Sequence, residues 1–331
     1  MTSGSVCWIV AALSSVPVTA AAQHESVRSD GYPTKPVRLL VGNAPGGGID
    51  LTARAIAQKL SAQWGRSVVV DNRPGASGLV AMDLTAQATA DGYTLLVTAG
   101  SLVASAQAQN KLRYDVRKAF APISQLTSSA YLLLVNPGLP VRSTKELIAY
   151  AKTKPGMLNY GHAGVGSAGH AGMELLRAKA GIEITPVAYK GSGLMLIDLM
   201  SNQVQLGLAS TIAGMSHVRS GKLLALAVTA ARRTQSIPEL PTIAESGIPG
   251  YDLVNWYGLF APAAMPPARS AALHRDVVQV LNHADVRALF GNDGAEAAPS
   301  RSREDFGALL ANELAKWEEI VRIPGFAATL R

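Results

Sequence analysis

The chain of 331 residues has one cysteine, an aromatic content of 5% and no run of five Lys or Arg residues. So few aromatic residues argue against large platforms that stack the bases of single-stranded nucleic acid. The 30 Lys and Arg residues are spread along the chain, so a nucleic-acid footprint is not indicated either. No segment after the first 22 residues approaches the roughly 20 apolar residues of a membrane span, and we expect a soluble protein without a nucleic-acid partner.

The first 22 residues contain no charged side chain. An apolar run from Val6 to Leu13 is followed by small residues that end at Ala22, which is the pattern of a secretory signal peptide, although the usual basic start is missing. Residues 1–22 are therefore predicted to be a signal peptide that directs secretion of the protein. Cleavage after Ala22 would remove Cys7, which excludes disulfides, catalytic thiols and thiolate metal sites.

Apolar residues make up 48% of the chain and charged residues 16%, which is ample material for a packed core. Short apolar runs alternate with longer helical patterns, which indicates an α/β architecture with mostly parallel sheets covered on both faces. The strand-like runs are Val37–Val41, Val68–Val70, Tyr93–Val97, Tyr131–Val135, Leu158–Tyr160, Thr185–Tyr189, Leu206–Leu208 and Leu224–Val228. The expected helices are Asp50–Trp64, Ser143–Thr153, Ala168–Ala180, Gly193–Ser201, Ala268–Leu281 and Arg303–Val321.

Two glycine-rich turns each lead from a strand into a helix. In the first, Gly46, Gly47 and Gly48 precede Asp50, which is predicted to be the N-cap of the following helix. In the second, residues 164–169 match G-x-G-x-x-G, and Ser167 is the expected N-cap. Such turns expose backbone N–H groups at a helix start, where an anion binds favourably. A purely geometric role for the glycines remains the alternative.

The dinucleotide interpretation of the second turn is weak, because the next strand ends Val187–Gly191 without an acidic residue for the ribose. If each turn belongs to its own α/β domain, the two face each other across a cleft and hold separated carboxylates with backbone amides.

Seven segments of the sequence resemble the tripartite tricarboxylate transporter receptors, the Bug-type periplasmic solute-binding proteins. They occur in the family's order, and the resemblance covers essentially all of residues 32 to 325. The first two contain Tyr32-Pro33-x-Lys35-Pro36-Val37-Arg38 and Ala44-Pro45-Gly46-Gly47-Gly48-x-Asp50. The other five are Asp71–Gly78, Ala90–Leu95, Tyr189–Gly191, Ser220–Thr229 and Pro241–Tyr251.

The resemblance implies a two-domain periplasmic-binding-protein fold of type II character, with mostly parallel sheets flanked by helices and two crossings between domains. After a loose leader at residues 23–33, the first domain is expected to comprise residues 34–133 and 258–331, and the second 134–257. The crossings would lie near Tyr131–Val135 and Trp256–Phe260.

The resemblance also implies which residues hold a ligand carboxylate. The expected site combines the loop Ala44–Asp50 with the opposing loop 161–167, and ordered waters assist. Many members have acidic residues at the positions of Gln205 and Ala209, so their replacement here favours a plain carboxylate over an amino-bearing ligand. The predicted ligand-binding residues are Ala44, Pro45, Gly46, Gly47, Gly48, Asp50, Ser101, Tyr131, His162, Gly164, Val165, Gly166, Ser167, Tyr189 and Ala209.

Several other candidate binding residues can also be explained by an ordinary structural role. Arg73 and Lys190 are cations that could pair with an anion, but a structural turn residue and a surface lysine are commoner interpretations. His162 and His170 lie eight residues apart on either side of a helix start, and scattered histidines are usually solvated, so we expect solvated histidines and no metal site. The pair Trp256–Tyr257 either walls the pocket or belongs to the core.

The sequence thus predicts a periplasmic receptor, without cofactor or catalytic activity, that closes around a dicarboxylate, tricarboxylate or aromatic acid. It would deliver this ligand, as a monomer, to a membrane permease. The alternative is a secreted α/β enzyme that binds a phosphate or nucleotide at the glycine loops. No G-x-S-x-G motif is present, since Val165 stands two residues before Ser167.

Overall fold

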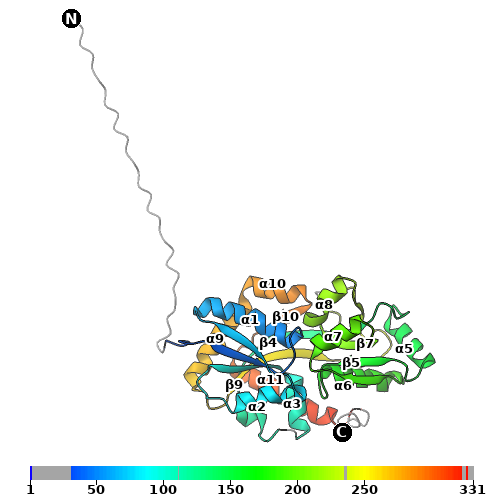
Figure 1. Cartoon of the computed structure of the whole chain (residues 1–331), viewed down its shortest axis with the longest axis horizontal. Coiled ribbons are helices and arrows are strands. Elements are labelled where there is room, and N and C mark those ends of the chain that lie inside the picture. Colours follow the sequence, from blue (N-terminus) through cyan, green and yellow to red (C-terminus); the bar gives the residue numbers. More distant parts are fainter. Residues whose placement is uncertain (2–30, 111, 235–236, 323–325, 327–331) are drawn as a thin grey trace.

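One long strand joins the two halves of the molecule in the computed structural model, which describes residues 1, 31–110, 112–234, 237–322 and 326 (Figure 1). This strand, β4 (Phe120–Val135), pairs with β9 (Val254–Pro262) up to Ala130 and with β7 (Leu206–Ser210) from Tyr131 onward. The strands follow the order β2-β1-β3-β9-β4-β7-β5-β6, and β8 and β10 also pair with β4. The change of partner within β4 is therefore the link between the halves.

The first half holds three parallel strands, with β1 between β2 and β3, followed by antiparallel β9 and β4. Its remaining strands are β1 (Val37–Val41), β2 (Val68–Asn72), β3 (Thr94–Ala99) and β10 (Ala295–Ala297). Its helices are α1 (Gly48–Trp64), the 3₁₀ turn η1 (Ala76–Gly78), α2 (Leu79–Ala86), α3 (Gly100–Ala108), α4 (Val116–Ala119), α9 (Pro267–Asn282), α10 (Ala284–Asn292) and α11 (Arg303–Ile320).

The second half repeats this plan, with β5 parallel to both β6 and β7, while β4 and β8 complete the sheet in antiparallel fashion. Its remaining strands are β5 (Asn159–His162), β6 (Thr185–Ala188) and β8 (Leu224–Val228). Its helices are α5 (Thr144–Thr153), α6 (Ala168–Ala180), α7 (Ser192–Met200) and α8 (Thr211–Arg219).

The predicted α/β fold with two crossings between domains is confirmed. The sheets are mixed rather than uniformly parallel, because each crossing strand runs antiparallel to its neighbours. The boundary expected at 133/134 falls within β4, and the one expected at 257/258 falls within β9.

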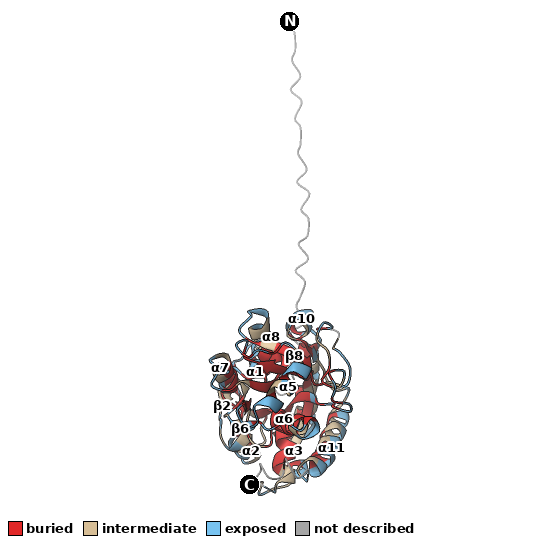
Figure 2. Ribbon diagram, turned by 90° about the vertical axis from the view of Figure 1, so that its right-hand side faces the viewer, coloured by how far each residue is buried: buried red, intermediate tan, exposed pale blue. Residues whose placement is uncertain are grey.

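The second part of β4 is buried on both faces, which explains its continuous apolar sequence. Successive side chains of a strand point to opposite faces. Accordingly Leu133 and Val135 belong to the main core, whereas Leu132 and Leu134 pack into a second, smaller core with Leu196 and Leu199 of α7. In Figure 2 the buried residues occupy the interior and the exposed ones lie on the outer helices.

The last residues of the expected loose leader, Tyr32 and Pro33, are packed against the first half. Residues 2–22 of the expected signal peptide and 23–30 of the expected leader lie outside the described residues. Tyr32 is buried, its hydroxyl donates to the Gly92 carbonyl at 2.6 Å, and its ring packs on Trp64 and Tyr93. Tyr32 and Pro33 are thus packed against the first half rather than loose.

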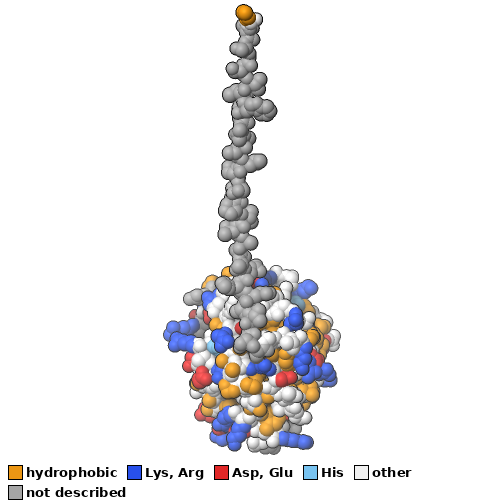
Figure 3. Space-filling view, turned by 90° about the vertical axis from the view of Figure 1, so that its left-hand side faces the viewer, with side chains coloured by type: hydrophobic (Ala, Val, Ile, Leu, Met, Phe, Trp, Pro, Cys, Tyr) orange, Lys and Arg blue, Asp and Glu red, His pale blue; other side chains and the backbone are white. Residues whose placement is uncertain are grey.

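The described helices include none that is both long and apolar enough to cross a membrane. On the face shown in Figure 3, basic and acidic side chains are interspersed rather than gathered by sign.

Candidate functional site

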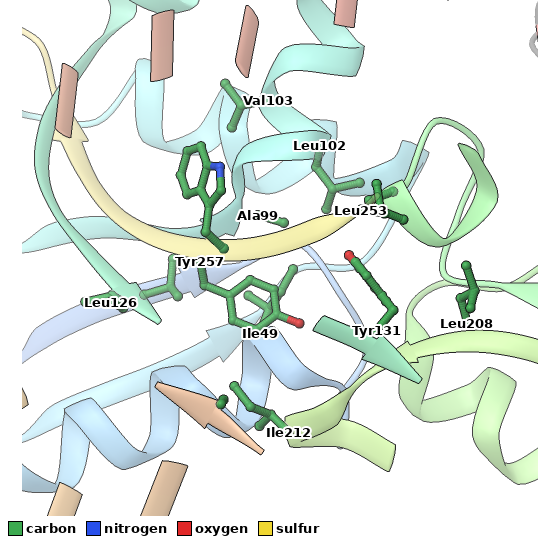
Figure 4. Packing of buried hydrophobic residues seen from close by; sticks show 14 of the residues in the cluster. Ile49, Ala99, Leu102, Val103, Leu126, Tyr131, Leu208, Ile212, Leu253 and Tyr257 are labelled. Atoms are coloured by element: carbon green, nitrogen blue, oxygen red, sulfur yellow. The ribbon is translucent and has the colours of Figure 1, made fainter. Parts of the chain in front are cut away.

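A cavity of about 40 Å³ lies between the two halves. Because one water molecule needs about 10–15 Å³, this closed arrangement leaves room for only a few waters. Its wall comes from both glycine turns, from the crossing strands β4 and β9, and from the starts of several helices. The lining residues are Asn43, Gly47, Gly48, Ile49, Ala99, Ser101, Leu102, Tyr131, Ala163, Ser167, Gly169, Ser192, Leu208, Ser210 and Tyr257; six of them are labelled in Figure 4.

Five helices begin at this cavity. Helices α1 and α3 approach it from the first half, and α6, α7 and α8 from the second. The amides of a helix's first turn have no acceptor within the helix. Four of the five starts also lack a side-chain cap; the exception is α6, where Ser167 accepts from the His170 N–H. Unfilled amide donors therefore concentrate around one small space.

None of the lining residues carries a charge. Each helix start contributes about half a positive charge from its aligned peptide dipoles. With no carboxylate in the wall to neutralise these dipoles, the cavity is electrostatically suited to an anion.

The buried side chain of Asp50 stabilises the first glycine turn without lining the cavity. The expected N-cap role is wrong, because α1 begins two residues earlier and its N-cap is Gly47. The Asp50 carboxylate instead accepts from the Gly46 N–H at 3.0 Å, from Arg54 Nε at 2.9 Å and from Asn72 Nδ2 at 2.9 Å. Burial alone would raise the pKa of Asp50, but these hydrogen bonds and the Arg54 charge hold it below its ordinary value.

Ser167 is the N-cap of α6, as predicted: its hydroxyl accepts from the His170 N–H at 3.2 Å. In the turn before it, Gly164 and Gly166 adopt φ angles of +132° and +81°, which side chains rarely tolerate. The Gly166 N–H donates to His170 Nδ1 at 3.2 Å and so points away from the cavity.

The two halves touch on both sides of the cavity. On one side, the Ala44 N–H donates to the Lys190 carbonyl at 2.8 Å, and a Cβ on Gly193 would lie 2.4 Å from the Pro45 oxygen. On the other side, a Cβ on Gly166 would lie 2.2 Å from Ser105 Oγ. Glycine is thus needed where the halves approach each other most closely.

Two tyrosines form part of the wall near the crossing strands (Figure 4). Tyr131 donates its hydroxyl proton to Asn255 Oδ1 at 2.9 Å. Burial raises the pKa of both Tyr131 and Tyr257, so both hydroxyls stay protonated at neutral pH.

Some predicted site residues line the cavity and others do not. Gly47, Gly48, Ser101, Tyr131 and Ser167 are in the wall. A smaller hollow on the cleft rim contains Val165 and Gly166. Residues outside both linings are Ala44, Pro45, Gly46, Asp50, His162, Gly164, Tyr189 and Ala209.

Ala209 is fully buried and packs in the smaller core, so it faces away from the cavity. Its neighbours Leu208 and Ser210 line the wall instead, because side chains of β7 alternate between faces. Tyr189 donates its hydroxyl to Asp198, and Gln205 Oε1 accepts from the Asn159 N–H. The positions expected to decide between plain and amino-bearing acids thus lie outside the wall.

The expectation of solvated histidines is wrong. His162 and His170 are 2% and 1% exposed, and their rings stack with centroids 4.1 Å apart. Of the two cations considered as anion ligands, Arg73 pairs with Asp71 at 2.9 Å, as expected for a structural turn residue. Lys190 bridges the halves through its carbonyl oxygen, which no argument from its side chain anticipates.

The residues missed from the sequence include Asn43, Ser192 and Ser210. Ser192 begins α7 and Ser210 is the N-cap of α8. Ser210 is the last residue of β7, and the sequence pattern could not single it out because it did not predict the helix α8 that follows.

Comparisons with known proteins agree with this geometry. Residues 52–326 match the family described as tripartite tricarboxylate transporter family receptor. The chain is 34% identical over 304 residues to protein BugT of Bordetella pertussis, covering 90% of this chain and 92% of BugT. An R. palustris protein solved with adipate is similar at a TM-score of 0.83 with 35% identity, over 89% of this chain and 98% of that one. MatC from Rhodopseudomonas palustris, with bound malate, gives a TM-score of 0.82 with 32% identity, over 88% and 100% of the two chains.

Proposed function

Because this chain belongs to the tripartite tricarboxylate transporter receptor family, we propose that it captures a small organic carboxylate in the periplasm by closing its two halves around the cavity. It serves as the binding component of an uptake system and carries out no chemistry on the ligand. We further propose that its two domains meet within β4 and just before β9.

The convergence of five helix starts on a cavity without charged side chains carries this proposal. A bound carboxylate accepts hydrogen bonds from amides that otherwise have only water, and it interacts favourably with the dipole of each helix. Donors come from both halves, so a ligand that uses all of them stabilises the closed arrangement over an open one.

The same wall supports a preference for acids without an amino group. An ammonium ion would enter a space surrounded by positive helix ends, and no lining carboxylate would accept its protons. Adipate and malate, which accompany the two related structures, have no amino group. Apolar lining residues such as Ile49, Leu102 and Leu208 suit the carbon skeleton of the acid.

The test is a thermal-shift screen followed by calorimetry. The panel contains dicarboxylates including adipate and malate, tricarboxylates, aromatic acids, aspartate, glutamate and nucleotides. We expect stabilisation by one or more plain acids, a smaller response to aspartate and glutamate, and no conversion of the bound acid on prolonged incubation.

Two outcomes contradict the proposal. A response to nucleotides alone favours an enzyme that binds phosphate at the glycine loops, and chemical turnover of a bound acid removes the receptor role. Delivery to a permease is tested separately, by loss of uptake of the identified acid when this gene is deleted.

A further inference from the structure

Two buried histidines lie beneath the second glycine turn, and the receptor role does not by itself account for them. His162 ends β5, immediately before Ala163 in the cavity wall, and His170 lies in the first turn of α6. The planes of their rings are within 12° of parallel, with centroids 4.1 Å apart. Two imidazoles are therefore stacked directly behind the loop 163–167, of which Ala163 and Ser167 face the cavity.

His170 is hydrogen-bonded to this loop through a ring acceptor. The Gly166 N–H donates to His170 Nδ1 at 3.2 Å, and a backbone amide can donate only to a nitrogen that carries no proton. His170 is thus neutral, with its proton on Nε2. Gly166 is one of the two glycines of this loop with positive φ, so the ring of His170 supports a strained part of the turn.

The surroundings keep both rings uncharged. Tyr160 of β5 lies on one side of the pair and the apolar ring of Phe326 packs on His170 at 5.0 Å. The nearby carboxylate, Glu174, is engaged by the Tyr160 hydroxyl and by Arg177 at 2.7 Å. Arg177 itself is a positive charge that opposes protonation of His170.

These contacts lower the pKa of both histidines. Burial first, and then the electrostatic influence of the adjacent His162 ring and of the Arg177 charge, lower the pKa of His170 to about 3. Burial also lowers the pKa of His162, and the nearby backbone of Gly164 partly opposes this shift. Both shifts favour the neutral rings that the geometry requires.

We propose that His170, stacked on His162, is a positioning residue that holds the loop 163–167 in its ligand-binding shape by accepting the Gly166 amide as a neutral imidazole. Protonation places an N–H against the Gly166 N–H, which breaks this hydrogen bond and loosens the loop where it meets Ser105 of the other half. The consequence for ligand capture rests on the proposed function; the hydrogen bond and the neutral ring do not.

The first experiment needs no ligand. In the full chain, nuclear magnetic resonance identifies which nitrogen of His170 is protonated at pH 7, and hydrogen exchange measures protection of the Gly166 amide. We expect Nδ1 to be bare and the amide to be protected. The variant His170→Phe keeps a ring in the stack but has no acceptor, so protection of Gly166 should fall by about tenfold. A proton on Nδ1 of the wild type, or unchanged protection in His170→Phe, overturns the proposal.

The second experiment separates positioning from simple packing. Asn carries an acceptor near the place of Nδ1 and does not titrate, so His170→Asn should restore Gly166 protection and bind the strongest acid of the panel within about threefold of wild type at pH 7. Because the pKa of His170 is about 3 in the folded chain, the ring stays neutral down to pH 4.5, so the ratio of wild-type to His170→Asn affinity should stay constant between pH 7 and pH 4.5. His217→Asn, on α8 away from this pair, is the control and should bind the acid as tightly as wild type does.

Equal losses in His170→Asn and His170→Phe refute the proposal, because they would show that the acceptor at this position does not hold the loop. If no acid in the panel binds, the proposed function fails, and the Gly166 exchange data still decide the role of His170.

Discussion

Gly48 provides the sharpest test of how the halves close. It is the first residue of α1 and part of the cavity wall. A Cβ at this position would lie 2.3 Å from Tyr257 Oη and 2.4 Å from Ser210 Oγ, both of which are buried. The backbone of Gly48 is in the ordinary negative-φ region, so alanine adds no backbone strain and even favours the helix by up to about 1 kcal/mol.

The two contacts act on different equilibria. Tyr257 is on β9 of the first half, so crowding against it lowers the stability of that half whether or not the cleft is closed. Ser210 is on the second half, so crowding against it opposes closure. Adding a methyl group to a packed site costs about 1–3 kcal/mol. If most of this cost opposes closure, Gly48→Ala weakens binding by about 5- to 150-fold.

Calorimetry with the strongest acid of the panel measures the loss of affinity, and thermal unfolding without ligand measures the loss of stability. Gly291→Ala is the matched control, since Gly291 lies in α10 and a Cβ there meets nothing within 4 Å. In a double-mutant cycle, Ser210→Ala should recover affinity in Gly48→Ala, whereas Tyr257→Phe should recover stability.

X-ray scattering should show that ligand compacts the wild type and Gly291→Ala more than Gly48→Ala. If Gly48→Ala binds the acid as tightly as Gly291→Ala does, the halves do not close on Gly48 and the reasoning is wrong.

Three further predictions test the charge, the turn and the buried histidine. Ser210→Asp should weaken acid binding more than about 100-fold, because two carboxylates about 5 Å apart at an effective dielectric of 20 repel by about 3 kcal/mol. The neutral variant Ser210→Asn should lose less than about tenfold in affinity. Equal losses of affinity in the two variants would contradict the charge argument. Asp50→Asn should lower the free energy of unfolding in urea by about 2 kcal/mol, since it weakens hydrogen bonds to a buried charge. The pKa of Asp50 is lowered in the folded chain, so wild-type Asp50 becomes protonated as the pH falls through that pKa, and the difference in stability between wild type and variant should shrink there. The pKa of His170 is about 3 in the folded chain against 6.5 unfolded, so the free energy of unfolding should fall as the pH drops below 6.5, by at most about 1.4 kcal/mol per pH unit from this group. In urea titrations at several pH values, His170→Asn should make this dependence on pH less steep. An unchanged dependence on pH would show that other groups cause it.

Local pattern was sufficient for most of the fold. The predicted strands Val37–Val41 and Leu224–Val228 and the predicted helix Ala168–Ala180 have the observed bounds. Continuous apolar runs and a serine cap are properties of neighbouring residues, so they can be read directly from the sequence. Helices α3 and α8 were missed because they are short and mostly buried, with no polar face to reveal a helical period.

The sequence by itself determined the α/β architecture, the two glycine turns and the family. Only the tertiary structure decided which donors face the cavity: the register of β7 directs Ser210 inward and Ala209 into the core, and the Gly46 and Gly166 amides are engaged by Asp50 and His170. The physical reason is that strand formation and helix capping depend on local chemistry. The direction of a side chain or amide depends instead on packing between segments far apart in the chain.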